Sequence, residues 1–143
     1  NNSVIKINDI LFVHGGISPE YLQYSLADIN DTIRSELEKY PNSPTKSYEA
    51  EASPLWYRGY YFNNPEEEAA HIDKVLQTFG VSRIIVAHTP TPGFIEPRFG
   101  GKVSFAYVGI SDAYGGWLAS VIIEGGEAYA LAASLVCSVE KTR

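Results

Sequence analysis

The sequence predicts an α/β fold, and three observations indicate it. Short β-prone runs open the chain, two amphipathic helical segments follow, and a continuous apolar run precedes a series of further strands. The 143 residues suit one domain, and a composition that is 45% hydrophobic and 13% aromatic suits a folded core. We therefore expect an α/β sheet with antiparallel strands at one end.

The first two strands are expected at Val4–Ile7 and Ile10–Val13, because both runs are rich in β-prone residues. Residues 8–9, Asn-Asp, separate the runs and favour a hairpin with a primed turn. The second run ends at residues 14–16, His-Gly-Gly, where the two glycines permit positive φ and the close approach of another part of the backbone.

The first helix is expected to start at residues 18–20, Ser-Pro-Glu, a cap followed by proline in the first turn. Apolar residues at spacings of three and four predict its buried face: Leu26, Ile29, Ile33 and Leu37. Pro41 ends the helix. Residues 41–53 contain few apolar side chains, so we predict an exposed loop there.

An aromatic segment, residues 54–62, precedes the second helix. Residues 64–68, Asn-Pro-Glu-Glu-Glu, combine a cap, a proline and acids near the positive end of the helix dipole. The buried face is predicted from Ala69, Ile72, Val75, Leu76 and Phe79. Gly80 is expected to end this helix.

Residues 81–87 form an apolar run that predicts a buried central strand, and the Pro-rich residues 89–93 after it predict a loop. Three more strands are expected at residues 103–108, 118–124 and 128–136. Residues 125–126, Gly-Gly, favour a hairpin turn between the last two.

The composition excludes several classes of protein. Lys and Arg total 11 against 17 Asp and Glu, so the net charge is −6 and offers no basic surface for nucleic acid. No apolar stretch approaches the roughly 18 residues that a membrane span needs. Residues 1–3 show no signal-peptide pattern, and a cytoplasmic or a periplasmic location both suit the sequence. The single Cys137 cannot form an internal disulfide and is expected to be a small core residue.

The chain contains no methionine and begins with Asn1. Translation starts with methionine, and its removal normally requires a small second residue. We therefore expect that the 143 residues are a single partial domain from a longer or processed protein.

Two histidines share a local context, since His14 and His88 each end an apolar strand and open a loop. Ligands bind beyond the carboxyl ends of strands in open α/β sheets, so the two imidazoles could share one metal ion. A single histidine at the end of a strand is more often a hydrogen-bonded structural residue than a metal ligand, and a catalytic metal needs about three protein ligands. The third histidine, His71, is expected on a solvated helix face beside Glu67.

Arg58 stands among aromatic residues and next to Gly59. Its guanidinium suits a phosphate group held by two hydrogen bonds, and it equally suits a cation–π contact that stabilises an aromatic cluster. Tyr114 lies in residues 111–116, whose composition is that of a turn. From the residues alone, the sequence favours a two-histidine metal or phosphate site on an α/β sheet.

Three segments resemble the calcineurin-like metallophosphoesterases, and most closely the phosphoprotein phosphatase branch with its Shewanella-like phosphatases. Residues 12–19, Phe-Val-His-Gly-Gly-Ile-Ser-Pro, are similar to the His-Gly-Gly segment of that superfamily. Residues 54–60, Pro-Leu-Trp-Tyr-Arg-Gly-Tyr, resemble the Leu-Trp-x-Arg segment of bacterial members. Residues 83–89, Arg-Ile-Ile-Val-Ala-His-Thr, resemble the last metal-binding segment, usually Val-x-Gly-His-Thr. The order matches that of the family.

The resemblance implies the C-terminal half of a calcineurin-like αββα sandwich, with a mixed β-sheet and flanking helices. It implies two divalent metal ions (Mn, Fe, Zn or Ni) that activate a hydroxide for attack on a phosphomonoester, including phosphoserine, phosphothreonine or phosphotyrosine on a protein. His14 and His88 would ligate one metal, and Arg58 would bind the phosphate and the charge of the transition state. Gly15, Gly16 and Tyr114 would contribute to the substrate pocket.

The Asp, His and Asn motifs of the family's first half do not occur in this sequence. Two neutral histidines cannot offset the charge of two divalent ions, so we expect this chain alone to bind metal weakly and to be inactive. An apolar sheet face should be open to the other half of the domain, to another chain or to a second copy. Two alternatives stay open: a non-catalytic half-domain that acts as a binding or oligomerisation module, and a nucleotide hydrolase for diadenosine polyphosphates.

Overall fold

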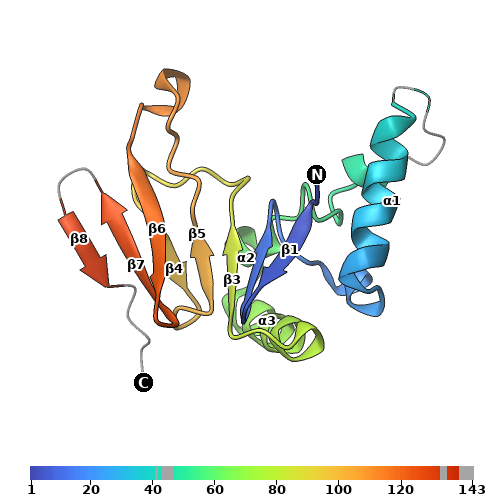
Figure 1. Ribbon diagram of the computed structural model, residues 1–143, viewed down its shortest axis with the longest axis horizontal. Coiled ribbons are helices and arrows are strands. Elements are labelled where there is room, and N and C mark those ends of the chain that lie inside the picture. The colour runs from blue at the N-terminus through green and yellow to red at the C-terminus, as the bar shows by residue number, and fades with distance from the viewer. Residues whose placement is uncertain (41, 43–46, 133–134, 139–143) are drawn as a thin grey trace.

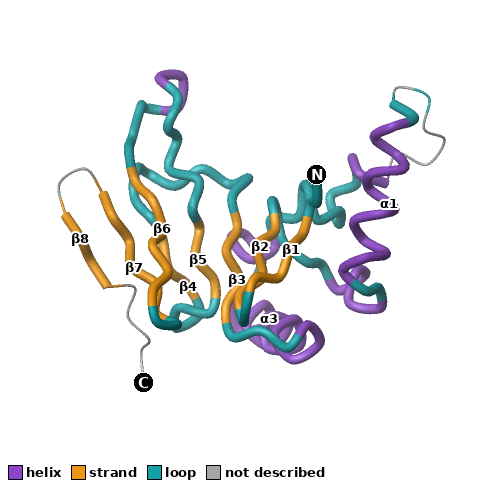
Figure 2. Tube along the Cα trace, in the orientation of Figure 1, coloured by secondary structure: helices purple, strands orange, loops and turns teal. Residues whose placement is uncertain are grey.

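A computed structural model describes residues 1–40, 42, 47–132 and 135–138. Figures 1 and 2 show two sheets side by side, with helices around the first of them. The elements follow in the order β1 (Val4–Ile7), β2 (Ile10–Val13), η1 (Pro19–Gln23), α1 (Leu26–Glu38), η2 (Ser47–Glu49), α2 (Gly59–Phe62), α3 (Pro65–Phe79), β3 (Arg83–Val86), β4 (Glu96–Arg98), β5 (Val103–Phe105), η3 (Asp112–Tyr114), β6 (Ala119–Glu124), β7 (Glu127–Ala132) and β8 (Leu135–Ser138).

The described strands form a five-stranded mixed sheet in the order β1-β2-β3-β5-β4 and a three-stranded antiparallel sheet in the order β6-β7-β8. Strands β2, β3 and β5 run parallel, while β1 and β4 pair antiparallel at the two edges. The α/β prediction is therefore confirmed. The antiparallel strands do not gather at one end as expected, because each edge of the mixed sheet carries one.

The core lies on one face of the five-stranded sheet. Alternate strand residues face it, and the helices cover it with side chains from α1, α2 and α3. The buried cluster contains Val4, Leu11, Val13, Ile29, Ile33, Tyr60, Ile72, Val75, Ile84, Val86, Val103 and Phe105. Strand β3 is buried throughout, which confirms the predicted central strand. The packing fixes the ends of β2 and β3 relative to one another.

Local signals account for most elements. Asn8 adopts a φ of 55° in the β1–β2 hairpin, and Gly125 and Gly126 form the turn between β6 and β7. Helix α3 begins as predicted, since the Asn64 side chain accepts hydrogen bonds from the amides of Glu66 and Glu67. It ends at Gly80, which is left-handed.

The first helical region differs from the prediction. Residues after Ser18 form only the short η1 turn, and α1 starts later, capped by Ser25. Ser25 and Asp28 form a reciprocal capping box that satisfies the free amides of the first turn. Leu37 belongs to the predicted buried stripe but is exposed near the end of the helix. Pro41 lies outside the described residues.

The described part of residues 41–53 contains the η2 turn, where Tyr48 is buried and its amide donates to Glu36 Oε2 at 2.9 Å. His71 is also buried, and the prediction of a solvated position was wrong. His71 lies on the inner face of α3, together with Glu68, Ile72 and Val75. Its Nε2 atom is 2.7 Å from the carbonyl oxygen of Ile17.

Three strand predictions need correction. Strand β4 was not predicted; it contains Pro97 and pairs only at the sheet edge, where a proline is tolerated. The strand predicted at 103–108 ends at Phe105. The strand predicted at 128–136 is two strands, β7 and β8, with residues 133–134 outside the described part of the chain. The side chain of Cys137 is likewise not described.

Candidate active site

His14 and His88 follow neighbouring parallel strands at the same edge of the sheet. Val13 pairs with Val86 in the β2–β3 register, and each histidine lies just beyond that pair. The His14 carbonyl accepts a hydrogen bond from the Ala87 amide at 2.9 Å, so the backbones remain paired up to the site. His14 Nε2 lies 3.1 Å from His88 Nδ1. The structure thus brings the two predicted residues together.

His88 adopts an unusual backbone conformation. Its φ is 40°, in the left-handed region that non-glycine residues seldom occupy. The Thr89 amide donates to the Ala87 carbonyl, so a three-residue turn closes around His88. Such strain persists only where the surrounding structure imposes it, and it is concentrated at functional sites.

Both imidazoles favour the neutral form. Burial lowers the pKa of His14 below its usual 6.5. Burial also lowers the pKa of His88, and the positive charges of Arg58 and of protonated His14 lower it further. Neutral imidazole is the form that binds metal ions. The buried Nε2 atom of His88 has no hydrogen-bond partner among the described residues.

The histidine pair fits two ligands of one metal ion. Metal–nitrogen bonds of about 2.0–2.1 Å place adjacent ligand nitrogens about 3.0–3.4 Å apart, and the observed separation is 3.1 Å. No cluster of three or more His, Cys, Asp or Glu side chains that could hold a metal occurs within the described residues. The described residues thus bring together two imidazoles with a spacing that would suit a shared ion, and metal binding by them stays a prediction.

Gly15 and Gly16 allow the aromatic segment, residues 54–62, to pack closely against the chain that follows His14. The Gly15 amide donates to the Pro54 carbonyl at 2.7 Å. A Cβ atom on Gly15 would lie 2.9 Å from the backbone nitrogen and oxygen of Tyr57, and one on Gly16 would meet the rings of Tyr57 and Tyr60. The glycines thus permit the close approach that the sequence indicated, without the positive φ. A contact of either glycine with substrate stays a prediction.

Arg58 lies exposed at the start of α2. Its charge is one cause of the lowered pKa of His88, and Trp56, which precedes Arg58 by two residues, packs against the His88 ring. Among the described residues, no carboxylate forms an ion pair with Arg58. The predicted cation–π contact of an aromatic cluster is instead made by Arg98, which lies 4.9 Å from the ring centroid of Tyr61. Arg58 is therefore available to an anion.

Residues that the sequence did not single out complete the site. The Trp56 ring packs edge-on against His88, with centroids 4.9 Å apart. Buried Glu68 accepts hydrogen bonds from Tyr57 Oη and Asn63 Nδ2, each at 2.8 Å. These bonds anchor both ends of the segment that carries Arg58. The run of three glutamates from residue 66 indicated only a helix start, so the inward direction of Glu68 was not apparent.

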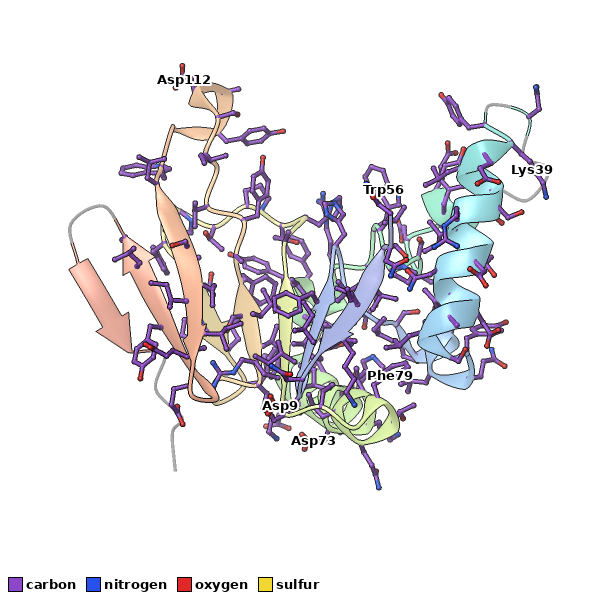
Figure 3. The ribbon with its side chains drawn as sticks, viewed as in Figure 1. Asp9, Lys39, Trp56, Asp73, Phe79 and Asp112 are labelled. Carbon is purple, nitrogen blue, oxygen red and sulfur yellow. The ribbon has the colours of Figure 1, made fainter. Side chains whose placement is uncertain are left out.

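Tyr114 is not brought to the histidine pair by any described contact. It lies in η3, and its ring packs on Tyr107 with centroids 5.6 Å apart. Figure 3 shows Asp112, in the same turn, at the opposite side of the view from Trp56. A pocket role for Tyr114 stays a prediction.

The chain has a mixed α/β fold with two paired histidines at one edge of its larger sheet. Comparisons with known proteins narrow the class of protein to which it is similar. No family model matches the sequence. An uncharacterised protein of Schizosaccharomyces pombe is 30% identical over 110 residues, which cover 73% of this chain and 33% of that protein. Shewanella-like protein phosphatase 2 of Arabidopsis thaliana is 29% identical over 100 residues, covering 62% of this chain and 24% of the relative.

Solved structures agree with these relatives. A cold-active protein-tyrosine phosphatase of a psychrophilic Shewanella matches with a TM-score of 0.82 and 28% identity, over 98% of this chain and 43% of that chain. The predicted resemblance to the Shewanella-like phosphatases is therefore confirmed. The chain spans between 24% and 33% of the curated relatives and under half of the solved phosphatase, as expected of a half-domain.

Proposed function

We propose that this chain supplies the histidine and arginine part of a metal-dependent phosphomonoester hydrolase site, with phosphoserine, phosphothreonine or phosphotyrosine of a protein as substrate. The observation that carries the proposal is the pair of imidazoles with ring nitrogens 3.1 Å apart. Arg58 follows the Trp56 ring that packs on His88, and it forms no ion pair with a carboxylate of the described residues. The relatives named as phosphatases support the same class of reaction.

His14 Nε2 and His88 Nδ1 would hold one divalent ion, with Mn, Fe, Zn and Ni all suited to imidazole. Such an ion supplies Lewis-acid polarisation of the phosphoryl group and a nucleophile at neutral pH. The chain's own contribution is orientation: the packed ends of β2 and β3 fix the two nitrogens, and the turn at His88 holds its ring toward His14.

Arg58 would bind two phosphate oxygens through its planar guanidinium. The same contact would stabilise the charge that develops on those oxygens in the transition state. Glu68 would keep Arg58 in place through its bonds to Tyr57 and Asn63.

The site also needs anionic ligands, because neutral histidines cannot balance the charge of two divalent ions. Within the described residues no carboxylate joins the histidines. We therefore expect this chain alone to bind metal weakly and to hydrolyse no phosphate ester at a useful rate, with the carboxylates supplied from outside the 143 residues.

The test measures metal content and turnover of p-nitrophenyl phosphate in added Mn²⁺. It compares this chain with the full-length protein that contains it. We expect activity only in the latter, and its loss in a variant that combines His14→Ala and His88→Ala. His71→Gln is the matched control, since His71 contacts the Ile17 carbonyl and not the histidine pair. Turnover that survives the double substitution would contradict the proposed metal ligands.

A second candidate function is a binding or oligomerisation module, and the outer face of β1 favours it. Ile5 and Ile7 are exposed there, and Phe12, the register partner of Ile5, is half-buried. Sedimentation of the chain and of an Ile5→Lys variant tests this function. The module would be favoured over the enzyme by two results together. The Ile5→Lys substitution would abolish self-association, and neither this chain nor the longer protein that contains it would bind metal or hydrolyse p-nitrophenyl phosphate.

A further inference from the structure

A cleft of about 1010 Å³ is lined by residues of η1, of the segment around η2 and of the segment around α2, and the histidine pair lies outside this lining. Trp56 joins the two, because it lines the cleft while its ring packs against His88. Arg58 lines the same cleft, and its charge acts on His88. A molecule whose phosphate binds Arg58 would therefore extend into this cleft.

The volume exceeds what a single phosphorylated side chain requires. Pockets for whole drug-sized ligands measure roughly 300–1,000 Å³, so the cleft has room for several residues of a polypeptide. Its apolar wall includes Trp56 and Phe62, whose exposed fractions are 47% and 67%. Exposed aromatic faces of this kind stack on peptide side chains and attract cations.

The charge of the cleft is predominantly negative. Three glutamates line it: Glu20, Glu49 and Glu51. None of them forms an ion pair with a Lys or Arg of the described residues. Arg58 is the one cationic residue of the described wall, so the phosphate end is positive and the rest is acidic.

A buried hydroxyl in the cleft wall also lacks a partner. Ser18 is 1% exposed, and its Oγ atom makes no hydrogen bond to any described residue. Its position before η1 would allow a cap, yet the side chain forms none. A buried hydroxyl without a protein partner can exchange a hydrogen bond with a group that reaches it, as the backbone of a bound peptide would.

We propose, on the basis of the phosphatase function proposed above, that this cleft binds the polypeptide around the phosphorylated residue and selects basic residues next to it. The carboxylates of Glu20, Glu49 and Glu51 pair with flanking Lys or Arg side chains. The Ser18 hydroxyl bonds to the peptide backbone. The same three carboxylates repel a polyphosphate, so diadenosine polyphosphates are disfavoured.

The experiment measures equilibrium binding of labelled peptides by fluorescence anisotropy, using the full-length protein that contains this chain. The probes are three labelled peptides that carry a non-hydrolysable phosphonate mimic of phosphotyrosine, flanked by Lys, Ala or Glu. Three exposed ion pairs, each worth a little under about twofold in affinity, predict roughly fivefold tighter binding of the Lys-flanked than of the Ala-flanked peptide at low salt. The Glu-flanked peptide should bind weakest.

A variant that combines Glu49→Gln and Glu51→Gln should lose about threefold in affinity for the Lys-flanked peptide and nothing for the Ala-flanked one. The matched control combines Glu38→Gln and Glu124→Gln, which remove the same charge from exposed positions outside the cleft. Added salt should reduce the difference between the peptides.

Equal binding of the three peptides, or an equal effect of both double variants, would overturn the proposal. Displacement of the Lys-flanked peptide by diadenosine tetraphosphate, with the nucleotide binding more tightly, would overturn it in favour of a nucleotide substrate. Turnover of p-nitrophenyl phosphate, measured in parallel, reports on the phosphatase function separately. If the protein showed no turnover but still bound the Lys-flanked peptide most tightly, the phosphatase function would be rejected and the peptide-binding site would be retained.

Discussion

The two sheets of this chain are stabilised in different ways. Every residue of β3 in the five-stranded sheet is buried, whereas most residues of β6 in the three-stranded sheet are exposed or half-buried. The histidine pair lies at the ends of β2 and β3 in the first sheet, while Arg58 and the cleft belong to the segments around η1, η2 and α2. The chemistry is thus attached where the backbone is held most firmly, as a precise site requires.

The largest expected effect contrasts one isoleucine from each sheet. Ile84→Ala should lower the free energy of unfolding by about 3 kcal/mol, because it leaves a cavity in a fully buried position. Ile122→Ala should lower it by less than about 1 kcal/mol, because that side chain is 41% exposed. Urea unfolding followed by circular dichroism measures both. Equal losses would show that the two sheets share one core.

The next effect concerns the glycine that seats the Arg58 segment. Gly15→Ala should destabilise the chain by about 2 kcal/mol, because its Cβ atom would press on the backbone of Tyr57. Gly125→Asn is the control: that position has open space and a φ of 60°, which asparagine tolerates, so we expect a change below about 0.5 kcal/mol. If Gly15→Ala were neutral, the aromatic segment would not be held against β2 as described.

Much of the fold was predictable because its signals are local. The turn at residues 8–9, the cap at Asn64 and the stop at Gly80 each satisfy backbone groups within a few residues, so spacing reveals them. The late start of α1 shows the limit: Ser18-Pro19-Glu20 and Ser25 both resemble caps, and the capping box with Asp28 decides between them. Strand β4 depends on pairing with β5, which no local pattern reveals.

The site divides in the same way. His14 and His88 were predictable because each follows an apolar strand, and parallel strands end at the same edge. The positions of Trp56 and Ser18 were not predictable, because they depend on a contact between segments that are far apart in the sequence. The hydrogen bond from the Ile17 amide to Tyr60 Oη, across 43 residues, is part of that contact. Residue type alone could not show which of these side chains would face the cleft.

A smaller effect is expected at the buried carboxylate beside Arg58. Tyr57→Phe removes the hydrogen bond to Glu68 and should lower the free energy of unfolding by about 1.5 kcal/mol, the lower end of the range for a bond to a charged group. Tyr24→Phe, at an exposed tyrosine, should change it by less than about 0.5 kcal/mol. In a Glu68→Gln background the loss from Tyr57→Phe should shrink. An undiminished loss would show that Tyr57 acts independently of Glu68.

The smallest effect is a change in imidazole titration, followed by NMR in chelator-treated protein. Both His14 and His88 should titrate below pH 6.5, because burial disfavours their charged forms. Arg58→Gln should raise the pKa of His88 toward its usual value, since the guanidinium charge is one cause of the lowering. The pKa of His14, lowered by burial, should stay unchanged, and Arg34→Gln should move neither.

The sign of the linked stability follows from the same shifts. Above pH 6.5 both imidazoles are neutral in the folded and the unfolded chain, so their contribution is constant. As the pH falls from 6.5 toward the lowered pKa values, the unfolded chain takes up protons that the folded chain does not, and stability is lost. Arg58→Gln should make this loss smaller. If the substitution left the pKa of His88 unchanged, Arg58 would not act on the histidine pair, and its proposed role in phosphate binding would lose the observation that supports it.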